Sequence, residues 1–183
     1  AHLAQFAVLG NTYATEVQGK TQPRVGLLNV GSEDVKGTEM IREAHQLCRG
    51  INLNFVGNLE GRDLFSNHAD VVVTDGFVGN IVLKTTEGLA AGLFGWLREA
   101  MEENPKRQFG AFLTKNAFRS IQKRHDPDTH GGAPLLGLRR PVIIAHGNAR
   151  AVAIAKALEQ AATAVSKKLT QRSEEHTSEL QSQ

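Results

Sequence analysis

The stretch ADVVVTDGFVGNIVLK, residues 69–84, decides the fold. It places three valines shortly before an acid, two glycines and an asparagine, and an apolar pattern with helical spacing follows. A short apolar run that ends in turn residues is typical of a buried parallel strand. The sequence therefore predicts a strand over residues 69–76 and a helix that starts at Phe77.

Two earlier segments have the same character as this strand. They are RVGLLNVG at residues 24–31 and NLNFVGN at residues 52–58, and both end in glycine or asparagine. Between them, residues 40–48 repeat apolar side chains at helical spacing, and Gly50 follows as a stop signal. This order predicts a strand, a crossover helix and a second parallel strand.

Other segments extend this alternation of strands and helices. Residues 1–17 have the pattern of a helix that is already under way at the first residue. Residues 81–101 carry apolar positions on more than one face, which predicts a long and mostly buried helix. PVIIAHGN at residues 141–148 predicts a fourth strand, and a C-terminal helix should run from Ala149 to about Leu169. The alternation predicts an α/β layered fold with a mainly parallel sheet.

The bulk composition narrows the class of protein. In 183 residues, 40% hydrophobic and 22% charged residues are ordinary for one globular domain. A net charge of +2, without aromatic residues interleaved among basic runs, argues against nucleic acid as a partner. The single Cys48 excludes a disulfide framework or a paired-cysteine metal site, and it suits a reducing cytoplasm. The chain contains no run of eighteen apolar residues, so the sequence predicts no membrane-spanning helix.

Both ends of the chain are unusual. There is no initiator Met, so we expect the chain to begin inside a longer protein. From Arg172 the sequence reads RSEEHTSELQS, which resembles the translation of a sequencing adapter and has no apolar face. We therefore expect residues 1–171 to be native and residues 172–183 to be a non-native tail.

Glycines and polar residues follow each predicted strand. The segments are NVGSEDVKG from Asn29, GNLEGRD from Gly57, DGFVGN from Asp75 and AHGN from Ala145. Parallel strands bring their carboxyl ends to one edge, where glycines and helix N-termini bind anions well. Because neither GxGxxG nor GxxxxGK[ST] is present, these loops predict a phosphate site and do not indicate a nucleotide.

Five ordered blocks of the chain carry a family resemblance. PRVGLLNVGSEDVKG, NFVGNLEGRD, ADVVVTDGFVGNIVLKTTEG, GGAPLLGL and PVIIAHGNA resemble successive blocks of the PlsX family, the bacterial phosphate acyltransferases of phospholipid synthesis. The similarity covers Phe6 to Leu169. It implies that residues 1–171 are the C-terminal part of a single phosphate acyltransferase domain and are inactive alone.

The resemblance implies a reaction and an assembly. The family transfers a fatty acyl group from acyl carrier protein to inorganic phosphate, forms acyl phosphate, and needs no metal or organic cofactor. Its fold is a Rossmann-like α/β sandwich related to isocitrate dehydrogenases and phosphotransacetylases, which here would be incomplete at the N-terminal side. Its members are homodimers. A phosphotransacetylase-like enzyme acting on acyl-CoA and a noncatalytic phosphate-binding module are the alternatives.

The chemistry of acyl transfer assigns candidate roles. Phosphate is already an oxygen nucleophile, so such an enzyme must mainly position it and stabilise the oxyanion that forms. We expect Lys36 to neutralise phosphate or the oxyanion, and Asn80 with the N–H groups of residues 76–80 to donate hydrogen bonds. These two residues are the catalytic candidates. The candidates for binding phosphate or substrate are Asn58, Arg62, Asp75, Gly76, Gly79, Lys84 and His146.

Several of these candidates have a structural alternative. Arg62 either binds phosphate through its guanidinium fork or pairs with a neighbouring acid. Asp75 either orients a lysine or accepts a proton, or it caps the following helix. His146 is either a proton carrier or a buried, hydrogen-bonded histidine. Lys84 lies one turn beyond Asn80 and either reaches the phosphate or is solvated.

Residues 104–123 form a basic amphipathic stretch with two interpretations. Its apolar side chains, among them Phe109, Phe112 and Leu113, could be core or dimer contacts. They could instead enter a bilayer while the basic residues meet anionic head groups. The family's peripheral membrane association, attributed to an equivalent helical tip, favours membrane contact. The expected location is therefore the cytoplasm, at the membrane surface.

Overall fold

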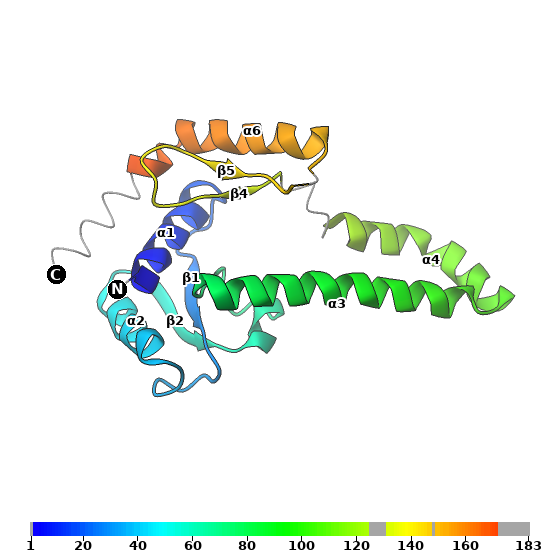
Figure 1. Cartoon of the computed structure of the whole chain (residues 1–183), viewed down its shortest axis with the longest axis horizontal. Coiled ribbons are helices and arrows are strands. Elements are labelled where there is room, and N and C mark those ends of the chain that lie inside the picture. Colours follow the sequence, from blue (N-terminus) through cyan, green and yellow to red (C-terminus); the bar gives the residue numbers. More distant parts are fainter. Residues whose placement is uncertain (1, 125–130, 148, 172–183) are drawn as a thin grey trace.

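The computed structural model describes residues 2–124, 131–147 and 149–171 (Figure 1). The predicted tail, residues 172–183, lies outside the described residues. The helices are α1 (His2–Glu16), α2 (Glu39–Gly50), α3 (Gly76–Glu102), α4 (Pro105–Arg124) and α6 (Ala151–Ser166), with a 3-10 turn η1 (Gly61–Phe65). The strands are β1 (Arg24–Leu28), β2 (Asn54–Leu59), β3 (Val71–Val73), β4 (Ala133–Pro134) and β5 (Ile143–Ile144).

A parallel sheet of three strands is the centre of the fold. Its order is β2-β1-β3, and β1 pairs in parallel with both neighbours. Helices α1 and α2 pack against each other and against this sheet. The shared core consists of Leu3, Ala4, Ala7, Val25, Leu27, Ala44, Cys48 and Val73. The α/β class with a parallel sheet flanked by helices, predicted from the sequence, is confirmed and is consistent with a Rossmann-like fold.

Strand β2 contains a bulge that changes which face its last residues present. Val25 pairs with Phe55, but Gly26 pairs with Gly57, so Val56 is an extra residue in the ladder. Gly57 has φ +92°, a left-handed conformation that glycine adopts without steric cost. The extra residue brings Asn58 opposite the core residue Leu27, on the face that α2 covers.

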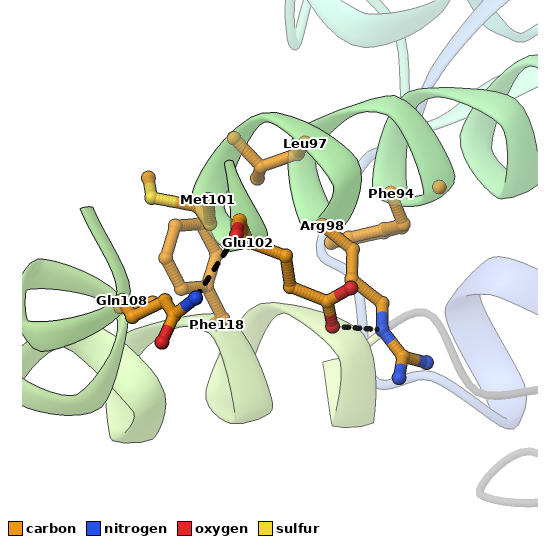
Figure 2. A pocket seen from close by; sticks show the side chains of 9 residues that line it. Phe94, Leu97, Arg98, Met101, Glu102, Gln108 and Phe118 are labelled. Atoms are coloured by element: carbon orange, nitrogen blue, oxygen red, sulfur yellow. Dashed lines mark hydrogen bonds and ion pairs between the residues drawn. The ribbon is translucent and has the colours of Figure 1, made fainter. Parts of the chain in front are cut away.

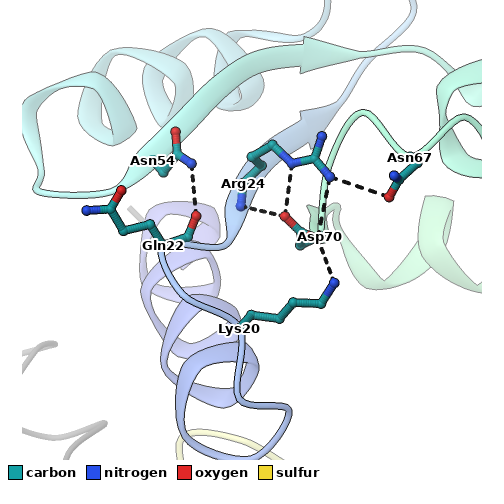
Figure 3. A network of polar contacts seen from close by, with 6 residues as sticks. All are labelled: Lys20, Gln22, Arg24, Asn54, Asn67 and Asp70. Carbon is teal, nitrogen blue, oxygen red and sulfur yellow. Dashed lines mark hydrogen bonds and ion pairs between the residues drawn. The ribbon is translucent and has the colours of Figure 1, made fainter.

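The amino ends of β1 and β3 are joined by one carboxylate. Asp70 Oδ2 accepts hydrogen bonds from the Arg24 backbone N–H (2.9 Å) and from Arg24 Nε (3.0 Å). Lys20 Nζ lies 3.1 Å from Asp70 Oδ1, and the Asp70 backbone N–H donates to Arg24 O at 2.8 Å. Figure 3 shows that these groups converge on Asp70. The contacts fix the two strands in register where they start.

The predicted fourth strand does not join this sheet. Residues 143–144 form β5, which pairs antiparallel with β4 in a separate two-stranded sheet. Helix α6 packs against β5 and begins close to the predicted start of the C-terminal helix. The expectation of a fourth strand in the parallel sheet is wrong because the backbone of residues 143–144 pairs with residues 133–134 instead.

Helix α3 is long, as expected, but it is not buried. Its 27 residues include none that is buried, and its main neighbour is α4. Figure 1 shows the pair projecting from the sheet as a helical hairpin. The prediction of a mostly buried helix is wrong for this chain, because its apolar side chains have few partners beyond α4. The exposed ones include Ile81, Leu83, Leu89, Leu93 and Trp96. No helix among the described residues is long and apolar enough to cross a membrane.

Candidate functional site

The three strands of the parallel sheet deliver their following loops to one edge. Leu28 of β1 pairs with Leu59 of β2, and Leu27 pairs with Val73 of β3. The backbone N–H of Asn29 donates to Leu59 O at 2.8 Å, so the pairing continues one residue beyond β1. The segments that carry Lys36, Arg62 and Asn80 therefore start from the same edge of the sheet.

The backbone at Lys36 is held from both sides. Its N–H donates to Glu33 O at 3.1 Å, and its carbonyl accepts from Asn29 Nδ2 at 3.1 Å. Gly37 follows with φ +88°, and a Cβ there would lie 2.3 Å from Asn29 Oδ1. The Lys36 side chain is exposed, and within the described part of the chain its ammonium group has no hydrogen bond or ion pair. A fixed backbone thus presents an available cation.

Arg62 shows the pairing that the sequence left as an alternative. Its Nη2 lies 3.1 Å from Glu60 Oε1, and its side chain is 78% exposed. Glu60 and Asp63 form a capping box at the start of η1, which places both acids in the same short turn. Arg62 would bind phosphate only by leaving Glu60, and an exposed pair of this kind is weak enough to exchange partners.

Asp75 caps α3, as the capping alternative predicted. Its Oδ1 accepts from the backbone N–H groups of Phe77 and Val78, both at 2.9 Å. The N–H of Gly79 donates to the Asp75 carbonyl at 2.9 Å. Three of the backbone donors that we expected for an oxyanion are therefore engaged already. The expectation that N–H groups of residues 76–80 donate to an oxyanion stays a prediction, and this arrangement would require those of residues 77–79 to exchange acceptors.

The other candidates on α3 differ in their surroundings. Asn80 is exposed in the first turns of the helix, and a Cβ at Gly76 would meet open space. A Cβ at Gly79 would lie 3.0 Å from Thr74 Cγ2, so that glycine permits close packing. The Asn80 side chain and the backbone N–H of Gly76 are therefore accessible polar groups at the start of α3.

Lys84 forms an ion pair with an acid on the same helix. Its Nζ lies 2.8 Å from Glu87 Oε2. The hydrogen bond from Lys84 lowers the pKa of Glu87, and the charge of His146 adds to this effect. His146 is exposed, so the alternative of a buried histidine is wrong.

Asn58 lies beneath the edge rather than at its surface. It is buried, its Nδ2 donates to Glu33 O at 3.0 Å, and its Oδ1 lies 3.1 Å from His45 Nδ1. Both ends of the amide are therefore used inside the protein. This arrangement favours support of the Lys36 loop over direct contact with phosphate.

Sequence reasoning did not identify His45. It is 3% exposed on α2, between Asn58 and Asp34. A signal was present, because position 45 lies four residues after Ile41 and three before Cys48, on the apolar face of the helix. A polar residue on such a face must find partners when it is buried.

A family model described as "Fatty acid synthesis protein" matches residues 1–172 of this chain. The chain belongs to this family. The predicted relationship to phosphate acyltransferases is thereby confirmed, since curated relatives that match the chain carry the name "Phosphate acyltransferase".

Three members of the family illustrate the similarity. The phosphate acyltransferase of Lysinibacillus sphaericus is 49% identical over 164 residues, which is 90% of this chain and 50% of the relative. That of Anoxybacillus flavithermus is 48% identical over 160 residues, 87% of this chain and 49% of the relative. That of Aquifex aeolicus is 44% identical over 160 residues, which is 87% of this chain and 48% of the relative. The chain spans about half the length of the curated relatives it matches.

A hollow of this family member lies in the helical hairpin, away from the sheet edge. Its volume is about 830 Å³, and Figure 2 shows side chains of α3 and α4 around it. Gln108 Nε2 donates to Glu102 O at 3.0 Å, and Arg98 Nε lies 2.8 Å from Glu102 Oε1. The apolar lining includes Phe94, Leu97, Met101, Ala111 and Phe118.

The Cys48 thiol is not poised for chemistry. Burial raises its pKa to about 11, which keeps it protonated and unreactive near neutral pH. Among the described residues, no group of three or more His, Cys, Asp or Glu side chains is arranged to hold a metal ion.

Proposed function

We propose that the protein to which this chain belongs transfers a fatty acyl group from acyl carrier protein to inorganic phosphate. The observation that carries the proposal is the exposed Lys36 ammonium, held on a fixed backbone at the edge where three loops start. The relatives' name supports phosphate as the acceptor. The family description supports a fatty acyl donor.

The reaction needs positioning more than bond-making groups from the protein. An oxygen of hydrogen phosphate attacks the thioester carbonyl carbon, the carbon–sulfur bond breaks, and the thiolate leaves and takes up the proton that the phosphate loses. Acyl phosphate and the free thiol are the products. Lys36 neutralises phosphate or the oxyanion, and the Asn80 amide donates to the same negative charge. No cofactor enters this scheme.

Arg62 and Lys84 are secondary candidates for binding phosphate. Each is exposed and paired with a single exposed or half-buried acid, Glu60 and Glu87 respectively. A phosphate dianion competes well with such a carboxylate because it offers more charge and more acceptor oxygens. We propose that these cations assist binding after they exchange partners, whereas Lys36 is available at once.

An assay with the full-length protein tests this function. Purified protein, inorganic phosphate and an acyl carrier protein thioester should release free thiol at a rate that saturates with phosphate. The control is the same reaction in buffer without phosphate or arsenate. A parallel reaction offers long-chain acyl-CoA as the competing acyl donor. Preference for acyl-CoA would replace the donor in the proposal with that of a phosphotransacetylase-like enzyme. Phosphate binding without thiol release would indicate a noncatalytic module.

We also propose that the tip of the hairpin contacts an anionic membrane surface from the cytoplasmic side. Phe109, Phe112 and Leu113 of α4 are exposed, with Phe112 at 71%, so they are not core residues of this chain. The same helix carries Lys106, Arg107, Lys115 and Arg119. Exposed apolar side chains beside basic residues are typical of helices that lie in a bilayer surface. Exposed apolar positions on α3 support homodimer formation as a further proposal.

Replacing Phe109, Phe112 and Leu113 together with aspartate should abolish vesicle binding. Each buried apolar side chain contributes about 1.5–3 kcal/mol, so the triple variant should lose well over tenfold in partitioning. The measurement is co-pelleting with vesicles that contain an anionic phospholipid, at low and at high salt.

A matched control replaces three residues of α6 with aspartate. They are Val152, Leu158 and Val165, which are also exposed and apolar. This variant carries the same added negative charge as the α4 variant, but away from α4. Equal losses in both triple variants would show a charge effect, and unchanged pelleting of the α4 variant would reject membrane contact by these residues.

A further inference from the structure

The turn that presents Lys36 depends on one carbonyl oxygen. Glu33 O accepts from the Lys36 backbone N–H at 3.1 Å and from Asn58 Nδ2 at 3.0 Å. The first bond closes the turn, and the second ties it to β2. The position of Asn58 therefore sets the position of the Lys36 backbone.

The hydrogen bond to Glu33 also fixes the orientation of Asn58. Because Nδ2 donates to that carbonyl, Oδ1 is the end that faces His45 Nδ1, at 3.1 Å. An amide oxygen only accepts hydrogen bonds, so His45 Nδ1 must carry the proton and donate. A chain of two hydrogen bonds thus links the His45 ring to the carbonyl that closes the Lys36 turn.

The other ring nitrogen faces the same loop. His45 Nε2 lies 3.3 Å from Asp34 Oδ1, although it makes no well-formed hydrogen bond within the part of the chain that the structure describes. Arg49 Nη1 holds Asp34 Oδ2 at 2.9 Å. A lone pair on Nε2 would be repelled by the carboxylate, whereas an N–H would be attracted. Asp34 is therefore a second point at which the His45 ring meets the loop.

The ring is held in place by β2. Phe55 meets it edge-on with a centroid separation of 5.1 Å, and the bulge at Val56 and Gly57 turns Asn58 toward it. Buried groups held on several sides keep one orientation, so His45 transmits the geometry of α2 and β2 to the loop.

We propose that His45 is a positioning residue for Lys36. Through Asn58 and Asp34 it holds the two consecutive loop residues Glu33 and Asp34, and so sets the height and direction of Lys36 at the sheet edge. The proposal rests on the function proposed above for Lys36. His45 itself is buried and touches no reacting group.

The test compares His45→Phe, which keeps a ring but removes both ring nitrogens, with His45→Asn, which can still donate to Asn58. Amide hydrogen exchange of Lys36, followed by NMR on the whole chain, reports the loop directly. We expect exchange about tenfold faster in His45→Phe and a smaller change in His45→Asn. In the full-length protein, the KM for phosphate should rise about tenfold in His45→Phe while kcat falls less. Gln46→Ala, on the exposed side of α2, is the matched control.

A surface variant guards against simple unfolding of a core mutant. Asp34 is 54% exposed, so Asp34→Asn should leave the core intact while it weakens the contact with His45 Nε2 and speeds Lys36 exchange. Unchanged Lys36 exchange in both His45→Phe and Asp34→Asn would overturn the proposal. Normal turnover in a Lys36→Ala protein would instead reject the function proposed for Lys36, and the exchange data would still decide whether His45 sets the loop.

Discussion

Replacing Lys36 with alanine should lower turnover of acyl carrier protein thioester by the full-length protein on the order of 100- to 1,000-fold. That range is typical for the loss of one group that stabilises a developing oxyanion. Lys36 is the expected site of this loss because its backbone is fixed by Glu33 and Asn29 and its ammonium group is exposed. The measurement is the initial rate of thiol release at saturating and at limiting phosphate.

The two phosphate concentrations separate two roles of Lys36. A fall in kcat at saturating phosphate indicates contact with the oxyanion, whereas a rise in KM alone indicates phosphate binding. Lys156→Ala is the control, because Lys156 is also exposed but pairs with Glu159 on α6. Near-normal rates in Lys36→Ala at both concentrations would remove Lys36 from the mechanism.

Replacing Asp70 with asparagine should lower the free energy of unfolding on the order of 2 kcal/mol at neutral pH, since hydrogen bonds to charged groups contribute about this much. The side chain is 12% exposed and joins Arg24 and Lys20 to the start of β3. Hydrogen bonds from Arg24, and then from Lys20, hold the pKa of Asp70 well below its usual range. Urea unfolding of the chain, followed by circular dichroism, measures the difference.

The sign of the pH effect follows from this lowered pKa. The folded state holds fewer protons on Asp70 than the unfolded chain does at mildly acidic pH. The contribution of Asp70 is therefore complete above the ordinary aspartate pKa of about 4 and is lost as the pH falls toward the folded value. The gap between wild type and Asp70→Asn should shrink on acidification. Glu159→Gln, at an exposed pair, should show a much smaller gap, and an Asp70→Asn gap that stays constant with pH would contradict the assignment.

The parts of the fold that were predicted correctly depend on local patterns. Three valine- and leucine-rich runs gave β1, β2 and β3, and helical spacing gave α2. The capping role of Asp75 follows from its place before Gly76, because a short carboxylate there reaches the first free N–H groups. Such features need only neighbouring residues, so a single sequence contains them.

The parts that failed depend on contacts between distant residues. Nothing near Ile143 shows that its partner is Pro134 rather than a strand of the parallel sheet. The apolar faces of α3 indicate burial, but whether another surface covers them is not a property of that segment. The polar character of position 45 on an apolar helix face is visible in the sequence, but its partners Asn58 and Asp34 lie on other segments and are not.

The extra residue in β2 has a consequence for how this region tolerates changes in length. Removing Val56 would make the ladder regular and would leave Asn58 opposite Leu27. Because paired residues of a regular ladder point to the same side of the sheet, the amide would keep facing the imidazole. Loss of this one residue should therefore preserve the packing of β2 against α2, whereas a further residue inserted into a regular ladder would turn Asn58 to the opposite side.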